Sequence, residues 1–182
     1  MTPKFRPTHL YLQQFIGCSI QPRKVSSMTE RLNYAKAFPE GIHALLNLGK
    51  VITASGLAPS LLELVKTRAS QLNGCAYCID MHTKDARAAG ETEQRLYALS
   101  AWREAPFFSP RERAALAWTE AITNIQQGHA SDEVYAEARR EFDETELVKL
   151  TLAITQINTW NRVAIAFRVE AGTYQPAAHV SA

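Results

Sequence analysis

Four residues between positions 63 and 82 have the types and the spacing of a thiol-based redox site: Glu63, Cys75, Cys78 and His82. On a helix, successive residues turn by about 100°, so both cysteines and His82 fall within roughly 60° of one another. Cys78 and His82 are four residues apart, the spacing at which helical side chains meet. Cys75 and Cys78 are close enough to form a disulfide across one turn. The pattern predicts a nucleophilic thiolate beside a proton acceptor, with a second thiol within reach.

The position of the cysteines along the chain strengthens this prediction. Asn73-Gly74 is a typical helix end, so both cysteines are expected in the first turn of the following helix. Unpaired amides and the helix dipole favour a thiolate there. A cysteine in such a pair, beside an imidazole, can have its pKa lowered from about 8.5 to about 7 or below. Such a thiolate is a nucleophile at neutral pH.

Glu63 completes the group if the helices before and after Gly74 fold back on each other. Glu63 precedes Gly74 by about 16 Å of helix and His82 follows it by about 12 Å. In a near-antiparallel pair the carboxylate would reach the ring and orient it, as the third member of a triad does. Because Glu63 lies opposite the apolar face of its own helix, that helix must be covered on both sides. The C-terminal helix or a second subunit would provide the cover.

Two other interpretations of these residues remain open. Ser60 and Glu63 match a capping box, in which Glu63 would only cap its helix. A Cys-x2-Cys pair is often half of a zinc site, and His82 and Glu63 would bring the number of ligands to four. Structural zinc sites usually use a second cysteine pair, however, and Cys18 is the only other cysteine in the chain.

The surrounding sequence predicts an all-α fold, a compact helical bundle. Helices are expected over about 40–54, 59–73, 75–90, 93–102, 110–127 and 144–170. Ser109-Pro110-Arg111-Glu112 and Asp143-Glu144-Thr145-Glu146 read as capping boxes that open the last two helices. The final helix carries apolar residues on several sides, so we expect it to be buried in the domain or against another subunit. No run of alternating polar and apolar residues indicates a strand.

Three segments divide the chain: an extended N-terminal arm over 1–27, one helical domain over 28–174, and a C-terminal tail over 175–182. His43, on an apolar helix, is expected in the core. Tyr34 is expected to approach the site, and Trp160 to lie in the core, in an interface or at the pocket. The other histidines are expected at the surface: His9, His129 and His179.

Composition narrows the classes of function. The 182 residues carry a net charge of +2, with 46% hydrophobic and 21% charged residues. This favours neither a nucleic-acid partner nor an anionic membrane, and no apolar run approaches the about 20 residues that span a bilayer. Three cysteines and no convincing secretory signal suggest a cytoplasmic protein with reactive thiols. The residues themselves require no cofactor and no metal.

The motif Glu-x11-Cys-x2-Cys-x3-His over 63–82 resembles the active-site motif of the alkylhydroperoxidase D (AhpD) family, in the wider carboxymuconolactone decarboxylase-like superfamily. Residues 31–123, about half of the chain, are similar to the core domain of that family. The resemblance implies an AhpD-like helical fold, trimeric or hexameric assembly, and peroxidase activity that depends on the cysteine pair. It also implies a proton path from Cys78 through His82 to Glu63, with Cys75 resolving the sulfenic acid.

One position departs from the family pattern. The best-known member has a histidine immediately before the second cysteine, where this chain has Tyr77. A phenol is not a base near neutral pH, so the role of that histidine does not transfer. The decarboxylase branch of the superfamily lacks the cysteine pair. The presence of that pair in this chain argues against decarboxylation.

These observations together predict a thiol-dependent hydroperoxide reductase. Its partners would be a small-molecule peroxide, an external dithiol or protein reductant, and further copies of the same chain. The first alternative is a general thiol-disulfide oxidoreductase that meets peroxide only incidentally. The second, from another class, is a zinc-binding structural or interaction protein.

Overall fold

The computed structural model describes residues 29–176, and every regular element in that range is helical. In chain order these elements are α1 (Tyr34–Ala37), α2 (Pro39–Thr53), α3 (Pro59–Asn73), α4 (Ala76–Ala88), α5 (Glu93–Ala98), η1 (Leu99–Ala101), α6 (Pro110–Thr123), η2 (Ile125–Gln127), α7 (Asp132–Glu141) and α8 (Glu144–Phe167). The all-α prediction is confirmed. The expected 1–27 arm, with Cys18 and His9, lies outside the described residues, as does His179. No helix within 29–176 is long and apolar enough to cross a membrane.

Local sequence signals set several helix ends where they were predicted. Both capping boxes form: the Ser109 side chain accepts from the backbone of Glu112, and the Asp143 side chain from the backbone of Glu146. Gly74 adopts a left-handed conformation, with φ 69° and ψ 31°, and ends α3. Because glycine takes this conformation without a steric cost, the chain can turn sharply there into α4.

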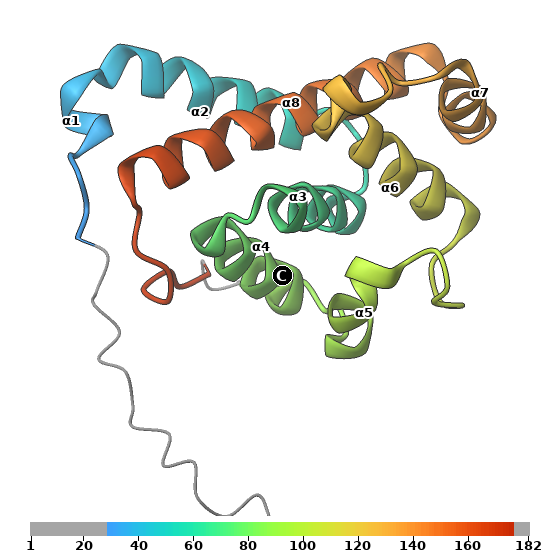
Figure 1. Ribbon diagram of the computed structural model, residues 1–182, viewed down its shortest axis with the longest axis horizontal. Helices are drawn as coiled ribbons and strands as arrows, with labels where there is room; N and C mark the ends of the chain where they lie inside the picture. Colours follow the sequence, from blue (N-terminus) through green and yellow to red (C-terminus); the bar gives the residue numbers. More distant parts are fainter. Residues whose placement is uncertain (1–28, 177–182) are drawn as a thin grey trace, which may run out of the picture.

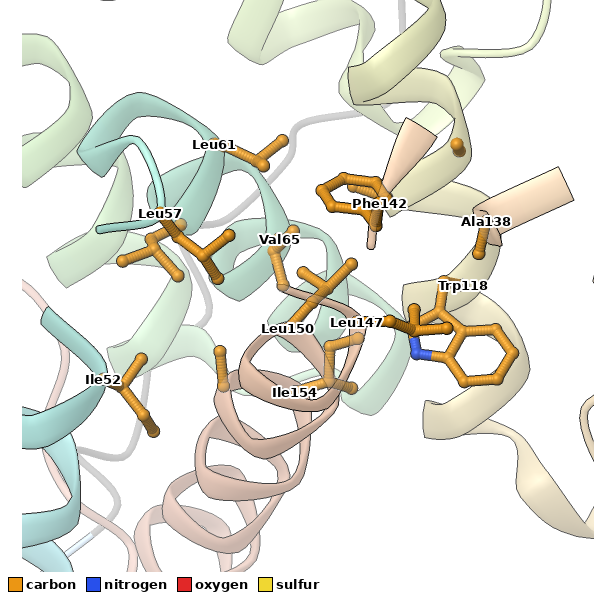
Figure 2. Close-up of a cluster of buried hydrophobic side chains, with 14 residues drawn as sticks. Ile52, Leu57, Leu61, Val65, Trp118, Ala138, Phe142, Leu147, Leu150 and Ile154 are labelled. Atoms are coloured by element: carbon orange, nitrogen blue, oxygen red, sulfur yellow. The ribbon is translucent and has the colours of Figure 1, made fainter. Parts of the chain in front are cut away.

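The central element of the bundle is α3, which packs against α4, α6 and α8. In Figure 1 it lies between α4 on one side and the neighbouring pair α2 and α8 on the other. Its buried side chains meet those of α6 and α8 in the core cluster of Figure 2, where Val65 lies close to Leu150. On the other side of α3, Thr67 and Ser70 are fully buried as well. The cover on both sides that Glu63 requires is therefore supplied within one chain.

The long helix α8 is buried on one side only. Leu150, Ala153 and Ile154 are fully buried, whereas Val148 and Leu152 are exposed within the single chain. The sequence predicted burial on several sides, in the domain or against another subunit. Inside the single chain, the domain buries one side of α8, and the apolar residues on its other side stay exposed.

Several details differ from the sequence predictions; the short helix α1, for example, was not predicted. Helix α7 was not predicted; it buries only Ala138 fully and carries acidic residues in its first turn and Arg139 and Arg140 in its last. Helix α6 ends at Thr123 and a short 3-10 turn follows it, where one continuous helix was expected. The core prediction for His43 is wrong: its side chain is exposed on α2, whose apolar residues cover only part of its circumference.

Candidate active site

The two cysteines form a disulfide at the start of α4. Cys75 is the N-cap residue of this helix, and its Sγ accepts a hydrogen bond from the backbone N–H of Cys78 over 3.3 Å. The Cα atoms of the pair lie 5.3 Å apart. Cys75 and Cys78 are 1% and 2% exposed, so bulk solvent hardly touches either residue. The sequence correctly placed the pair at a helix N-terminus.

Glu63 and His82 meet across the pair of helices α3 and α4. Glu63 Oε2 lies 2.8 Å from His82 Nδ1, and Glu63 Oε1 accepts from Lys66 Nζ over 2.8 Å. The predicted fold-back of the two helices is confirmed. The capping interpretation of Glu63 is wrong, because the N-cap of α3 is Ala58 and no side chain caps that end.

The charge state of Glu63 determines the tautomer of the ring. Burial by itself would raise the pKa of the Glu63 carboxyl, but the hydrogen bond from His82 and the charges of His82 and Lys66 outweigh burial and hold that pKa below its ordinary value. A carboxylate accepts and does not donate, so Nδ1 carries the proton in this bond. Nε2 is then the acceptor of the neutral ring. It is buried, and no group within residues 29–176 forms a hydrogen bond with it.

A cavity of about 670 Å³ opens over Cys78 and His82. Its walls come from α2, α4 and α8, with Tyr34 added from α1 and Lys66 from α3, and Cys75 does not line it. The prediction that Tyr34 approaches the site is confirmed, and Trp160 lies at the pocket. Carbon atoms make up most of the lining surface. The disulfide can therefore be approached through the cavity from the side of Cys78.

Asp85 extends the polar group beyond the predicted four residues. Its carboxylate accepts a hydrogen bond from the Tyr174 hydroxyl over 2.7 Å. Glu63, His82 and Asp85 each offer one atom within 4.8 Å of the others, a donor set that suits a divalent cation. This set contains neither cysteine, so it differs from the zinc site considered from the sequence. The sequence could have indicated Asp85, because it follows His82 by three positions and so lies on the same face of α4.

Burial is the larger cause of the raised pKa of Tyr174, and the hydrogen bond to Asp85 raises it further. Tyr174 therefore stays protonated and remains a donor at neutral pH. Its segment, which follows α8, returns to α4 (Figure 1), where the Gly172 N–H donates to Asp80. Position 174 is far from 85 in the sequence, and no local pattern linked the two.

Comparison with known proteins places this arrangement in a family. Residues 39–121 match the Carboxymuconolactone decarboxylase family. The uncharacterized protein YdfG of Bacillus subtilis (strain 168) is 48% identical over 139 residues, which is 76% of this chain and 95% of YdfG. The chain belongs to the carboxymuconolactone decarboxylase family.

Solved structures of several proteins share the fold. ATU0492 of Agrobacterium tumefaciens, a protein of unknown function described as a candidate antioxidant defence protein AhpD, is 43% identical. Its TM-score is 0.77, over 80% of this chain and all of that one (100%). An uncharacterized peroxidase-related protein of Silicibacter sp. TM1040 has a TM-score of 0.68 at 22% identity, over 78% of this chain and 76% of that one. The debrominase Bmp8 has a TM-score of 0.69 at 22% identity, over 76% and 74% of the two chains.

This member of the carboxymuconolactone decarboxylase family has an AhpD-like fold. The name of ATU0492 refers to antioxidant defence. Because the likeness at 22% identity concerns the fold alone, the chemistry has to be argued from the site.

Proposed function

We propose that the protein is a thiol-dependent hydroperoxide reductase, with Cys78 as the nucleophile. The observation that supports this most strongly is the 2.8 Å bond between Glu63 and His82 Nδ1, which leaves the buried Nε2 free to accept a proton. His82 follows Cys78 by one turn of α4, and both line the same cavity. A base beside a thiol at a helix N-terminus is the arrangement that activates cysteine nucleophiles.

In the oxidation step, His82 Nε2 takes the proton of the Cys78 thiol. The thiolate attacks the outer oxygen of the hydroperoxide, an S–O bond forms and the O–O bond breaks. Cys78 becomes a sulfenic acid, and the departing alkoxide takes the proton from His82 and leaves as an alcohol. Glu63 holds the ring in one tautomer throughout, so it acts as a positioning residue.

Cys75 then resolves the sulfenic acid. Its sulfur attacks the Cys78 sulfur, the disulfide forms, and the hydroxyl leaves with the thiol proton as water. An external dithiol then reduces the disulfide. One of its thiolates attacks the sulfur of Cys78, which faces the cavity, and Cys75 departs as a thiolate. The second thiol of the same donor then attacks the donor sulfur bound to Cys78, Cys78 leaves as a thiolate, and the donor departs as an intramolecular disulfide. In the structure Cys75 Sγ accepts a hydrogen bond from the backbone N–H of Cys78. The same bond would stabilise the departing Cys75 thiolate.

The burial of the pair favours this function over general thiol-disulfide exchange. A disulfide on another folded protein would have to enter the cavity to meet Cys78, since both cysteines are at most 2% exposed. A small peroxide fits within the cavity of about 670 Å³ that Cys78 lines. The cysteine pair also sets the site apart from decarboxylation, for which no thiol is needed.

The experiment that tests the proposal measures peroxide consumption with dithiothreitol as the donor. Wild-type protein should turn over, and Cys78→Ser should consume no peroxide above the uncatalysed rate. Oxidation of the reduced protein by a protein disulfide, followed in parallel, should be slower than oxidation by peroxide. If the protein disulfide oxidises the protein faster than peroxide does, the protein is a general thiol-disulfide oxidoreductase instead. Stoichiometric zinc in protein purified under reducing conditions would instead show a zinc-binding structural or interaction protein.

Self-association belongs to the proposal as well. Exposed apolar side chains occur on the two adjacent helices α2 and α8, among them Leu46, Val51, Val148 and Leu152. Burying them against further copies of the chain would match the expected trimer or hexamer. Sedimentation equilibrium tests this directly, and a monomer at micromolar concentration would contradict it.

A further inference from the structure

The cavity over Cys78 is far larger than hydrogen peroxide requires. A molecule the size of water takes up about 30 Å³ of liquid, against about 670 Å³ here. Cavities of about 300–1,000 Å³ normally enclose whole organic ligands. Aliphatic and aromatic side chains such as Leu46, Ile157 and Trp160 form much of the wall. The space therefore suits a hydrocarbon body several times larger than the peroxide group.

The charges around this cavity have one sign. Lys50 and Lys66 line it, and within residues 29–176 no aspartate or glutamate does. Lys66 is paired with Glu63. Lys50 lies in the last turn of α2, and the described part of the chain shows no ion pair for it. One ammonium group thus remains to meet a negative charge on a ligand.

The redox site and Lys50 reach the cavity from different helices. Cys78 and His82 come from α4 and Lys50 from α2, and both helices pack against α8. A ligand that fills the space can contact Cys78 with one part and Lys50 with another. Gly49, next to Lys50, has no side chain; a Cβ there would come within 2.6 Å of Gln156 Nε2. The close approach of α2 to α8 keeps this wall in place.

We propose that the cavity binds an amphiphilic monocarboxylate, with the carboxylate at Lys50 and the hydrocarbon body along the α2 and α8 walls. If the proposed peroxidase function holds, on which this assignment of substrate rests, the preferred substrate is a fatty-acid hydroperoxide whose O–O bond reaches Cys78. Lys50 is then a specificity-determining residue. An exposed ion pair contributes up to about a fivefold change in affinity, and that is the preference expected.

Binding is tested on the full-length protein without any turnover. Titration calorimetry with dodecanoate and with dodecanol compares two probes of equal chain length that differ in charge. The wild type should bind dodecanoate about fivefold more tightly than dodecanol, Lys50→Gln should bind the two equally, and Lys50→Arg should keep the preference. Lys36→Gln, which removes an exposed lysine of α1 outside the cavity, is the matched control and should behave as the wild type.

Equal binding of the two probes by the wild type, no binding of either, or a preference that survives in Lys50→Gln would overturn the proposal. A kinetic arm compares linoleic acid hydroperoxide with its methyl ester, using the wild type and Lys50→Gln. Turnover of both at equal kcat/KM by the wild type would refute the substrate assignment and leave the peroxidase function standing. Turnover of neither, with the dodecanoate preference intact, would refute the peroxidase function and leave the carboxylate site standing.

Discussion

Glu63 Oε2 accepts a hydrogen bond from His82 Nδ1 over 2.8 Å, and the residues belong to two helices joined by the turn at Gly74. This bond fixes which ring nitrogen is free, and the free one is buried beside the cavity. The tautomer of His82 therefore depends on a residue 19 positions away. Two predictions start from this pair.

Replacing Glu63 by glutamine should lower kcat/KM for peroxide by about tenfold to a hundredfold, less than the about 100-fold to 10,000-fold effect of losing a general acid-base group itself, because Glu63 acts through His82. The amide of glutamine can donate as well as accept, so it no longer enforces the proton on Nδ1. Stopped-flow oxidation of the reduced protein measures the effect. Glu170→Gln removes an exposed carboxylate and serves as the control; a Glu63→Gln rate within twofold of this control would contradict the positioning role.

The same substitution should alter the acid stability of the protein. The pKa of Glu63 is lower in the folded protein than its ordinary value of 4.5. A carboxyl of this kind adds stability that is fully present above its unfolded pKa and is lost as the pH falls through its folded pKa. The difference in unfolding free energy between wild type and Glu63→Gln should thus shrink as the pH falls below 4.5. Urea unfolding at several pH values tests this, and a constant difference would disprove it.

Tyr174→Phe should lower the free energy of unfolding by about 1 kcal/mol, the usual net value of one hydrogen bond. The hydroxyl that is lost donates to Asp85 over 2.7 Å and holds the segment after α8 against α4. Tyr97→Phe is the matched control, because Tyr97 also donates to a carboxylate, that of Glu93, but is 76% exposed. We expect the control to change stability by less than about 0.5 kcal/mol; equal effects of the two variants would show that the segment adds no stability.

A buried amide network anchors the turn before the cysteines. Asn161 of α8 is fully buried, accepts from Asn73 Nδ2 over 2.8 Å and donates to Ser70 Oγ over 3.0 Å. Asn161→Leu should cost about 1–3 kcal/mol in unfolding free energy, because it leaves buried polar groups with fewer partners. Thr159→Ala, at an exposed position of the same helix, should be nearly neutral. A loss below about 0.5 kcal/mol for Asn161→Leu would contradict this account.

Local signals made much of the fold predictable. The two capping boxes and Gly74 act on neighbouring backbone groups, so residues within one turn were enough to locate those helix ends. Helix α7 was missed because it has few apolar residues. Its signal lay in its charges instead, with acidic residues at its start and Arg139 and Arg140 at its end.

The part of the candidate site that lies on α4 and on the neighbouring helix α3 was predictable. Cys75, Cys78 and His82 share α4, and a simple length estimate brought Glu63 to them. The cavity, the environment of Lys50 and the bond from Tyr174 to Asp85 depend on how α2, α8 and the C-terminal segment pack. These are contacts over long sequence separations, which no helical period encodes.

The most direct test of the central claim is to trap the oxidised sulfur. Reduced Cys75→Ser protein is mixed with one equivalent of hydroperoxide and then with dimedone, and the labelled residue is identified by mass spectrometry. The account predicts one dimedone adduct per chain, on Cys78, formed in a single round of peroxide consumption without turnover. Unmodified Cys78 with the peroxide left intact, or an adduct at another residue instead, would contradict it.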